Sequence, residues 1–250
     1  MLKKILLTTV ALLLSAYLVY FLFYSKHDDV KENLICKELR IDIVDASDRH
    51  YLTQDNILAS IAKAKLSPVG KNMSAVSTAV IENKLEENRL IRKAECYKTI
   101  DGTVRIKIYQ REPVLRIFSM KESYYVDSEG EIMPIPDNFA AYVPVASGYI
   151  EKGYATKQLY GFALFLRQDK FWNSQIKQIY VAQNGDVELT PAVGDFRIIL
   201  GKIENYKENL DKLRLFYDKG LSKVGWNKYS VINLKYDNQV VCTKKTTVKN

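Results

Sequence analysis

The sequence predicts an α+β protein: an N-terminal transmembrane helix, a strand-helix-helix-strand-strand module, and a mainly antiparallel β domain with two packed helices. Three observations support this fold class. Residues 5–24 form one uncharged run, residues 39–43 and 104–108 alternate between apolar and polar side chains, and residues 203–216 repeat apolar side chains every three or four positions. The composition, 47% hydrophobic and 26% charged, is that of an ordinary globular chain.

The run 5–24 contains no charge, proline or glycine, and as a helix it would be about 30 Å long, enough to cross a bilayer core. Lys3 and Lys4 place positive charge on its N-terminal side, so we expect residues 1–4 to be cytoplasmic and the bulk of the chain to be periplasmic or extracytoplasmic. A cleaved signal peptide is the alternative. We favour a retained single-pass anchor in the inner membrane, because the run is long and ends in bulky side chains.

Residues 25–35 are polar and predict a tether between the membrane and the first module, which we place at 36–111. In that module Thr53 is expected to cap a first helix, and a second helix fits residues 74–88. The Asp-Gly dipeptide at 101–102 predicts a tight hairpin between the last two strands. A three-stranded sheet with two helices on one face would bury the apolar sides of both.

The second module is predicted to span residues 112–243. Its helices are expected at 157–168 and over the apolar stripe described above, with strands wherever apolar residues alternate. Residues 137–155 contain prolines and glycines and predict a loop-rich stretch. A last strand is expected over 231–243, with a kink or turn near positions 237–238.

No catalytic or metal-binding motif is present. The two histidines, His27 and His50, lie in the tether and in a loop, and no serine has the surroundings of a hydrolase nucleophile. The three cysteines, Cys36, Cys96 and Cys242, lack zinc-ligand spacing and suit small apolar positions on strands; whether Cys36 and Cys96 form a disulfide stays open. We therefore predict a protein that is not an enzyme and that uses no cofactor and no metal.

The formal net charge is +8, but the lysines are interleaved with acids along the chain. The one clear cluster is at residues 244–250, for which we predict a disordered basic tail. We expect a solvated surface and no binding to nucleic acid. Asp127, Glu129 and Glu131 crowd one turn and would suit a metal ion or acid-base chemistry. A solvated hairpin around Gly130 explains the same residues and is the interpretation we favour.

Four features follow one another along the chain. The first is a short basic end with one hydrophobic segment, followed by the strand-helix-helix-strand-strand module. The other three are short motifs. The motifs are Val104–Val114 (VRIKIYQREPV), Tyr125–Ile132 (YVDSEGEI) and Val231–Tyr236 (VINLKY). Together these features resemble the FtsQ/DivIB family of bacterial cell-division proteins, in which a POTRA domain precedes a β domain. The corresponding family motifs read I-x-V-x-E-R-x-P-V, V-D-x-x-G and V-D-L-R-Y. The chain departs from them at Gln110, Asn233 and Lys235.

The resemblance implies a divisome scaffold at the septum that links early and late division proteins by binding FtsB/FtsL-type coiled-coil bitopic partners. It also implies the contact surface, namely the late strand and the helix before it, where the partner adds a strand to an exposed sheet edge. The matching residues here are Leu234, Lys235, Tyr236, Val240 and Val241. Tyr236 would be the main contact, because tyrosine offers a large area at low entropic cost, although the pattern alone fits a core position equally well. Other divisome membrane proteins are expected to bind the POTRA-like module.

Two other functions stay open at this point. A POTRA-bearing export or outer-membrane assembly factor would carry tandem POTRA modules, whereas this chain shows a single one. An extracytoplasmic enzyme or ligand sensor would need a pocket with convergent polar groups, and the sequence offers none.

Overall fold

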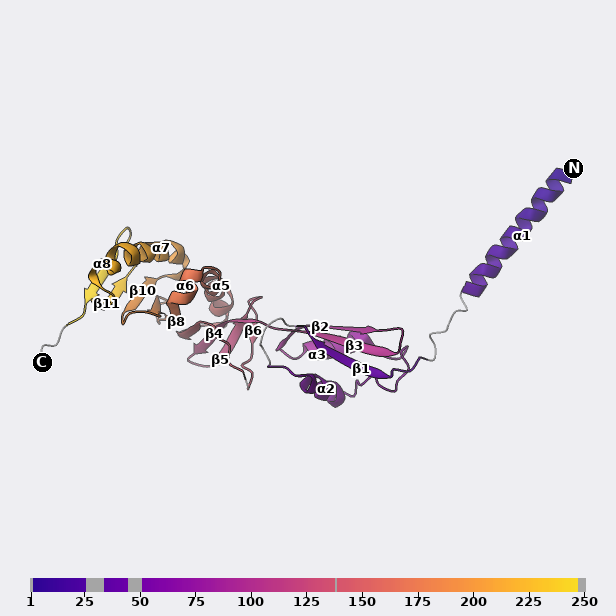
Figure 1. Cartoon of the computed structure of the whole chain (residues 1–250), viewed down its shortest axis with the longest axis horizontal. Helices are drawn as coiled ribbons and strands as arrows, with labels where there is room; N and C mark the ends of the chain where they lie inside the picture. Colours follow the sequence, from indigo (N-terminus) through magenta and orange to yellow (C-terminus); the bar gives the residue numbers. More distant parts are fainter. Residues whose placement is uncertain (1, 26–33, 45–50, 138, 247–250) are drawn as a thin grey trace. The chain divides into compact units, whose positions relative to one another are not determined.

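The structure is a computed structural model that describes residues 2–25, 34–44, 51–137 and 139–246 (Figure 1). By their internal contacts the residues group into two compact units. Unit 1 comprises residues 1–44, 53–87 and 93–109, and unit 2 comprises residues 45–52, 88–92 and 110–250. Most of the predicted tether, both histidines and the end of the predicted tail lie outside the described residues.

Helix α1 (Leu2–Ser25) includes the apolar run 5–24. Within the described part of the chain, no helix combines the length and the apolar character that a bilayer crossing requires. The membrane span is therefore still a prediction from the sequence.

Beyond α1, unit 1 follows the predicted strand-helix-helix-strand-strand order. Its elements are β1 (Glu38–Ile43), α2 (Gln54–Lys63), α3 (Thr78–Glu86), β2 (Ile91–Lys98) and β3 (Thr103–Gln110). The strands form a sheet in the order β1-β3-β2, with β1 parallel to the central strand β3. Figure 1 shows α2 and α3 beside these strands. The sheet therefore has two outer strands, β1 and β2.

Local signals explain the ends of these elements. The Thr53 side chain accepts a hydrogen bond from the Asn56 N–H, and the Asn56 side chain accepts one from the Thr53 N–H, so α2 begins with a capping box. Gly102 has φ +88°, a left-handed conformation that glycine adopts without strain, and it closes the predicted hairpin. Apolar side chains from helices and strands form the core: Ile41, Ile57, Ile61, Ile81, Leu85, Ile91, Val104, Ile106 and Ile108.

Unit 2 is built on a nine-stranded sheet in the order β12-β11-β10-β9-β8-β7-β4-β5-β6. Its strands are β4 (Pro113–Ser119), β5 (Ser123–Asp127), β6 (Ile132–Met133), β7 (Val145–Gly148), β8 (Ile176–Val181), β9 (Val187–Pro191), β10 (Arg197–Gly201), β11 (Tyr229–Asn233) and β12 (Val241–Lys244). Its helical segments are α4 (Lys152–Tyr154), η1 (Ala155–Leu159), α5 (Tyr160–Gln168), α6 (Lys170–Gln175), η2 (Ile203–Asn205), α7 (Tyr206–Phe216), η3 (Tyr217–Leu221) and α8 (Ser222–Val224).

This sheet is mixed rather than simply antiparallel. The pairs β4–β7, β7–β8 and β10–β11 run parallel, and the other neighbouring pairs run antiparallel. The physical reason is connectivity, since parallel neighbours need a crossover. Strands β5 and β6 lie in the connection from β4 to β7, and helices supply the other two crossovers. The segment from α4 to α6 connects β7 to β8, and α7 connects β10 to β11. Strand direction depends on such pairings, which periodicity along the chain does not report.

One hydrophobic core joins the helices to the strands. It includes Phe162 and Leu166 from α5, Leu210 and Leu213 from α7, and Trp172 from α6, all packed with strand residues. Figure 1 shows α5, α6 and α7 running along the strands of this unit. The predicted amphipathic helix is confirmed by α7. The short helix α6 was not expected, nor was the strand β7, which lies within the stretch predicted as loop.

Candidate partner-binding site

The last predicted strand is a hairpin of two strands, β11 and β12. Asn238 lies between them with φ +56°, a left-handed conformation that asparagine tolerates better than most residues. The turn expected near positions 237–238 is therefore present. It folds the chain back, so that β12 pairs antiparallel with β11 and ends the nine-stranded sheet.

The five candidate contact residues have different surroundings. Leu234 is fully buried in the core, so its side chain is not available to a partner and we do not carry it into the contact surface. Tyr236 and Val241 are 49% and 42% exposed, which rules out the core position considered for Tyr236. Val240 is half-buried, and Lys235 is exposed. Tyr236, Val240 and Val241 are thus the accessible apolar side chains of the set.

Lys235 is held by an acid from another part of the sheet. Its Nζ lies 2.8 Å from Oδ2 of Asp186, a buried carboxylate in the turn between β8 and β9, and Lys202 Nζ lies 3.4 Å from the other oxygen. The Lys235 ammonium, helped by Lys202, lowers the pKa of Asp186 below its ordinary value. Lys235 therefore positions the chain between β11 and β12, in addition to any contact that it makes with a partner.

A second lysine fixes the same segment from helix α7. Lys212 Nζ donates to the backbone carbonyls of Leu234 and Tyr236, at 2.8 and 2.9 Å. Between the helix and the turn lies a groove of about 340 Å³. Its lining residues come from α7, η3 and the turn: Lys212, Leu215, Phe216, Lys219, Gly220, Asn238, Gln239 and Val240. The predicted contact surface included the helix before the last strand, but none of its residues was named. The exposed Leu215 on an otherwise polar side of this helix is a signal for them.

The backbone of β12 leaves one side open. The Lys245 N–H donates to the Lys228 carbonyl next to β11 at 3.1 Å. Pairing groups alternate along a strand, so Thr243 also faces β11 while Cys242 and Lys244 direct their N–H and C=O groups outward. Among the described residues no strand pairs with this outer side. The groove includes Val240, the residue immediately before β12, so it lies next to the start of this strand.

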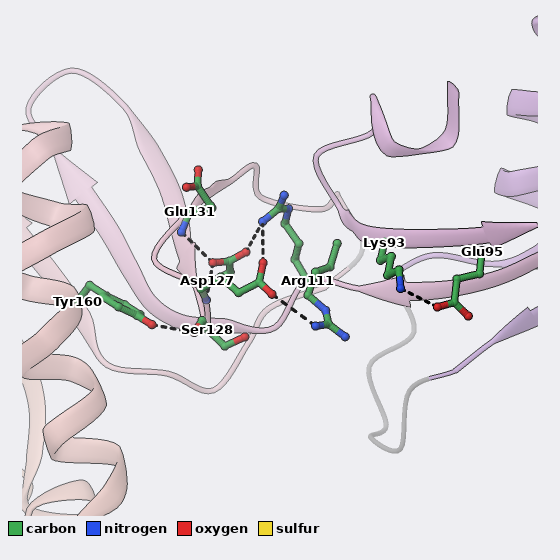
Figure 2. A network of polar contacts seen from close by, with 9 residues as sticks. Lys93, Glu95, Arg111, Asp127, Ser128, Glu131 and Tyr160 are labelled. Atoms are coloured by element: carbon green, nitrogen blue, oxygen red, sulfur yellow. Dashed lines mark hydrogen bonds and ion pairs between the residues drawn. The ribbon is translucent and has the colours of Figure 1, made fainter. Parts of the chain in front are cut away.

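The acidic turn between β5 and β6 is built around the buried Asp127 carboxylate, while Glu129 and Glu131 are exposed. Asp127 is fully buried; one carboxylate oxygen accepts the N–H groups of Glu129 and Glu131, and the other accepts Arg111 Nη1 at 2.6 Å (Figure 2). Tyr160 OH also donates to the carbonyl of Ser128 at 2.7 Å in the same turn. The arginine of the R-E-P motif and the aspartate of the V-D-S-E-G motif thus form one ion pair. The predicted hairpin is present, and Glu129 and Glu131 are exposed in it. The expectation of a solvated turn was wrong only for Asp127, because the sequence does not reveal that Arg111 reaches this carboxylate.

The remaining candidates for chemistry stay separate. Cys36, Cys96 and Cys242 are free thiols, and no bridge joins the first two. Burial and the nearby Glu82 carboxylate raise the pKa of the Cys96 thiol to about 11. In the described ranges, no three histidine, cysteine, aspartate or glutamate side chains gather in a way that would hold a metal ion.

Both parts of the chain match known protein families. The family described as "FtsQ/DivIB, C-terminal related" matches residues 112–243, which is more than half of the chain. The chain belongs to the FtsQ/DivIB family. The description "POTRA-like domain" matches residues 34–109, the part that contains the three-stranded sheet. Membership in this family makes the chain a non-enzymatic cell-division protein, as the sequence predicted.

Several solved structures also match this FtsQ/DivIB chain. No curated protein matches it significantly. Among solved structures, it is similar to the major extracytoplasmic domain of the trans isomer of the cell-division protein DivIB from Geobacillus stearothermophilus. The two share 10% sequence identity with a TM-score of 0.33, over 46% of this chain and 97% of the other.

Proposed function

We propose that this chain is a divisome scaffold that binds an FtsB/FtsL-type bitopic partner along the outer side of β12 and so links early and late division proteins. The observation that carries the proposal is the position of β12 at the end of the nine-stranded sheet, with the outward groups of Cys242 and Lys244 facing no strand among the described residues. Unpaired N–H and C=O groups accept an incoming extended segment, and alternating side chains then provide selectivity.

The groove beside β12 gives the added strand a second contact. Leu215, Phe216 and Val240 offer apolar surface there, and Tyr236 and Val241 are exposed nearby on the hairpin. A partner that continues from its added strand into a helix or turn would insert one apolar side chain into this groove. Such a central apolar contact surrounded by polar residues is the usual arrangement of a binding hot spot.

The uncharged run 5–24 within α1 supports an inner-membrane anchor with a cytoplasmic N-terminus. In this proposal the anchor keeps both units outside the cytoplasm, where bitopic partners expose their extracytoplasmic segments. The POTRA-like unit then contributes contacts to other divisome membrane proteins. A fluorescent fusion to the full chain should form a band at midcell, and depletion should produce filamentous cells.

The direct test removes one outward donor without changing the rest of the sheet. In Lys244→Pro the backbone N–H is lost and the proline ring stands where a partner strand would pair. Affinity for the FtsB/FtsL-type partner, measured by titration with the purified full-length chain, should fall at least about tenfold, equivalent to about 1.4 kcal/mol.

The matched control is Lys244→Ala, which removes the charge and keeps the N–H, so the affinity should stay within about twofold. Circular dichroism and the thermal midpoint of each variant report whether the fold persists. Equal binding by the proline variant and the wild type would exclude pairing along β12. An equal loss in both variants would assign the contact to the lysine charge instead.

A further inference from the structure

Strand β2 in unit 1 is an outer strand whose pairing groups are occupied by side chains. It ends the order β1-β3-β2. The Ala94 N–H donates to Glu86 Oε1 at 2.9 Å, and the Cys96 N–H donates to Glu82 Oε1 at 2.6 Å. Both acceptors belong to helix α3. Two carboxylates thus take the positions that carbonyl groups of a neighbouring strand would occupy.

The spacing of the two elements explains why this match works. Residues two apart on a strand direct their N–H groups to the same side about 6.6 Å apart, as Ala94 and Cys96 do. Residues four apart on a helix lie on the same face about 6 Å apart along its axis, as Glu82 and Glu86 do. A helix that runs beside an outer strand can therefore place two carboxylates at nearly the same spacing as the outward N–H groups of the strand.

Packing holds α3 in this position. Ile81 and Leu85 of the helix are buried, and the side chains of Ala94 and Cys96 are buried on the strand opposite. The helix cannot roll away without exposing this apolar surface. Hydrogen bonds from N–H groups to carboxylates are also stronger than those to neutral acceptors.

The other outer strand of the same sheet also has a side-chain partner for its backbone. On β1, the Ile41 carbonyl accepts a hydrogen bond from Nε2 of Gln54 in α2 at 2.9 Å. Each helix thus provides polar groups of the complementary kind, a donor toward a carbonyl of β1 and acceptors toward N–H groups of β2. The arrangement at β2 is the more complete, because two successive outward donors are satisfied.

We propose that Glu82 and Glu86 form an edge guard, which closes β2 to the addition of a further strand. Without the guard, the outer side of β2 would present free donors beside apolar side chains, and a second copy of this chain would pair with it. The guard goes beyond the proposed partner site on β12, because it concerns the other unit and prevents an interaction rather than making one.

The test is hydrogen exchange of the full-length chain in detergent, resolved to the amides of residues 94 and 96. Glu82→Ala should accelerate exchange at Cys96 at least about tenfold and leave Ala94 nearly unchanged, and Glu86→Ala should do the reverse. The double alanine variant should accelerate both and should form dimers as its concentration rises, measured by sedimentation velocity.

The control is Glu82→Gln with Glu86→Gln, which keeps an acceptor oxygen at each position while removing the charge. It should protect both amides nearly as well as the wild type and stay monomeric. Exchange at Val104 and Ile106 in β3 monitors the fold, because a general loss of structure would accelerate these amides too. Unchanged exchange at both amides in the single alanine variants, or a double alanine variant that stays monomeric, would overturn the proposal.

Discussion

The outer strands β2 and β12 differ in whether their outward-facing backbone groups have hydrogen-bond partners. On β2, successive outward N–H groups donate to Glu86 and Glu82. On β12, the outward groups of Cys242 and Lys244 meet no such side chain among the described residues, and a groove lies at the turn that leads into this strand. An unpaired strand border attracts other chains, so the two proposals together would confine pairing with other chains to β12.

The far end of the nine-stranded sheet shows a third arrangement. Its outer strand β6 contains only Ile132 and Met133. The turn that leads into it is held by the buried Asp127 carboxylate and Arg111. A very short outer strand offers few groups to an incoming chain. Within unit 2, the outer strand β6 is therefore too short to pair with another chain, whereas β12 is long enough.

The largest expected effect on stability concerns the turn that leads into the short outer strand β6. In Asp127→Ala the Arg111 guanidinium loses its buried partner and two backbone N–H groups lose their acceptor. Breaking one side of a buried ion pair costs about 3 kcal/mol, so we expect that loss in the free energy of unfolding measured with urea. The half-exposed Glu129, whose Oε2 lies 3.9 Å from Arg111, provides the control. Glu129→Ala should cost less than about 0.5 kcal/mol, and similar losses in both variants would argue against the buried network.

An intermediate effect sharpens the role of the hairpin that β11 and β12 form. Tyr236→Ala removes an exposed ring and should weaken binding of the FtsB/FtsL-type partner by about 2 kcal/mol, while the thermal midpoint stays nearly unchanged. Tyr180→Ala is a matched control, because this tyrosine is also partly exposed but lies on β8. Calorimetric titration measures both. If the two substitutions weaken binding equally, the contact is not confined to the β12 side of the sheet.

The smallest effect concerns the acid that holds Lys235. Asp186→Asn removes the charge and should lower the free energy of unfolding at pH 7 by about 1 kcal/mol. Because the folded protein lowers the pKa of Asp186, the ion pair stabilises the fold at pH values above about 4 and this stabilisation is lost as the pH falls through the lowered pKa. Urea titrations at several pH values should show the wild type and the variant converging in acid. A difference that stays constant down to pH 2, about two units below the ordinary pKa, would contradict the assignment.

Periodicity in the sequence predicted the elements whose partners are local. The capped helix at Thr53, the hairpin at Gly102 and the amphipathic helix α7 all follow from neighbouring residues. Strand β7 was missed because it is short, ends in a glycine and is identified by its parallel neighbours rather than by its own pattern. The tertiary structure, not the local sequence, determines that it is a strand.

The sequence predicted where along the chain the candidate site lies, but not which of its side chains are exposed. The motif VINLKY located the last hairpin, yet alternation alone did not show that Leu234 faces the core while Tyr236 is exposed. The link between Lys235 and Asp186 spans 49 positions in the sequence, and a single sequence gives no signal for such a contact. The groove depends on how α7 packs against the turn, which is equally a tertiary property.

The position of β12 in the chain also sets when the proposed border becomes available during synthesis. Within the part of the chain that the structure describes, strand β12 pairs only with β11, and β11 reaches the sheet through the crossover helix α7. Residue 244 must therefore leave the ribosome before the border exists, by which time the other eight strands of the sheet have already been translated. A nascent chain that stalls or misfolds earlier would present no such border, so only a completed fold would recruit the partner.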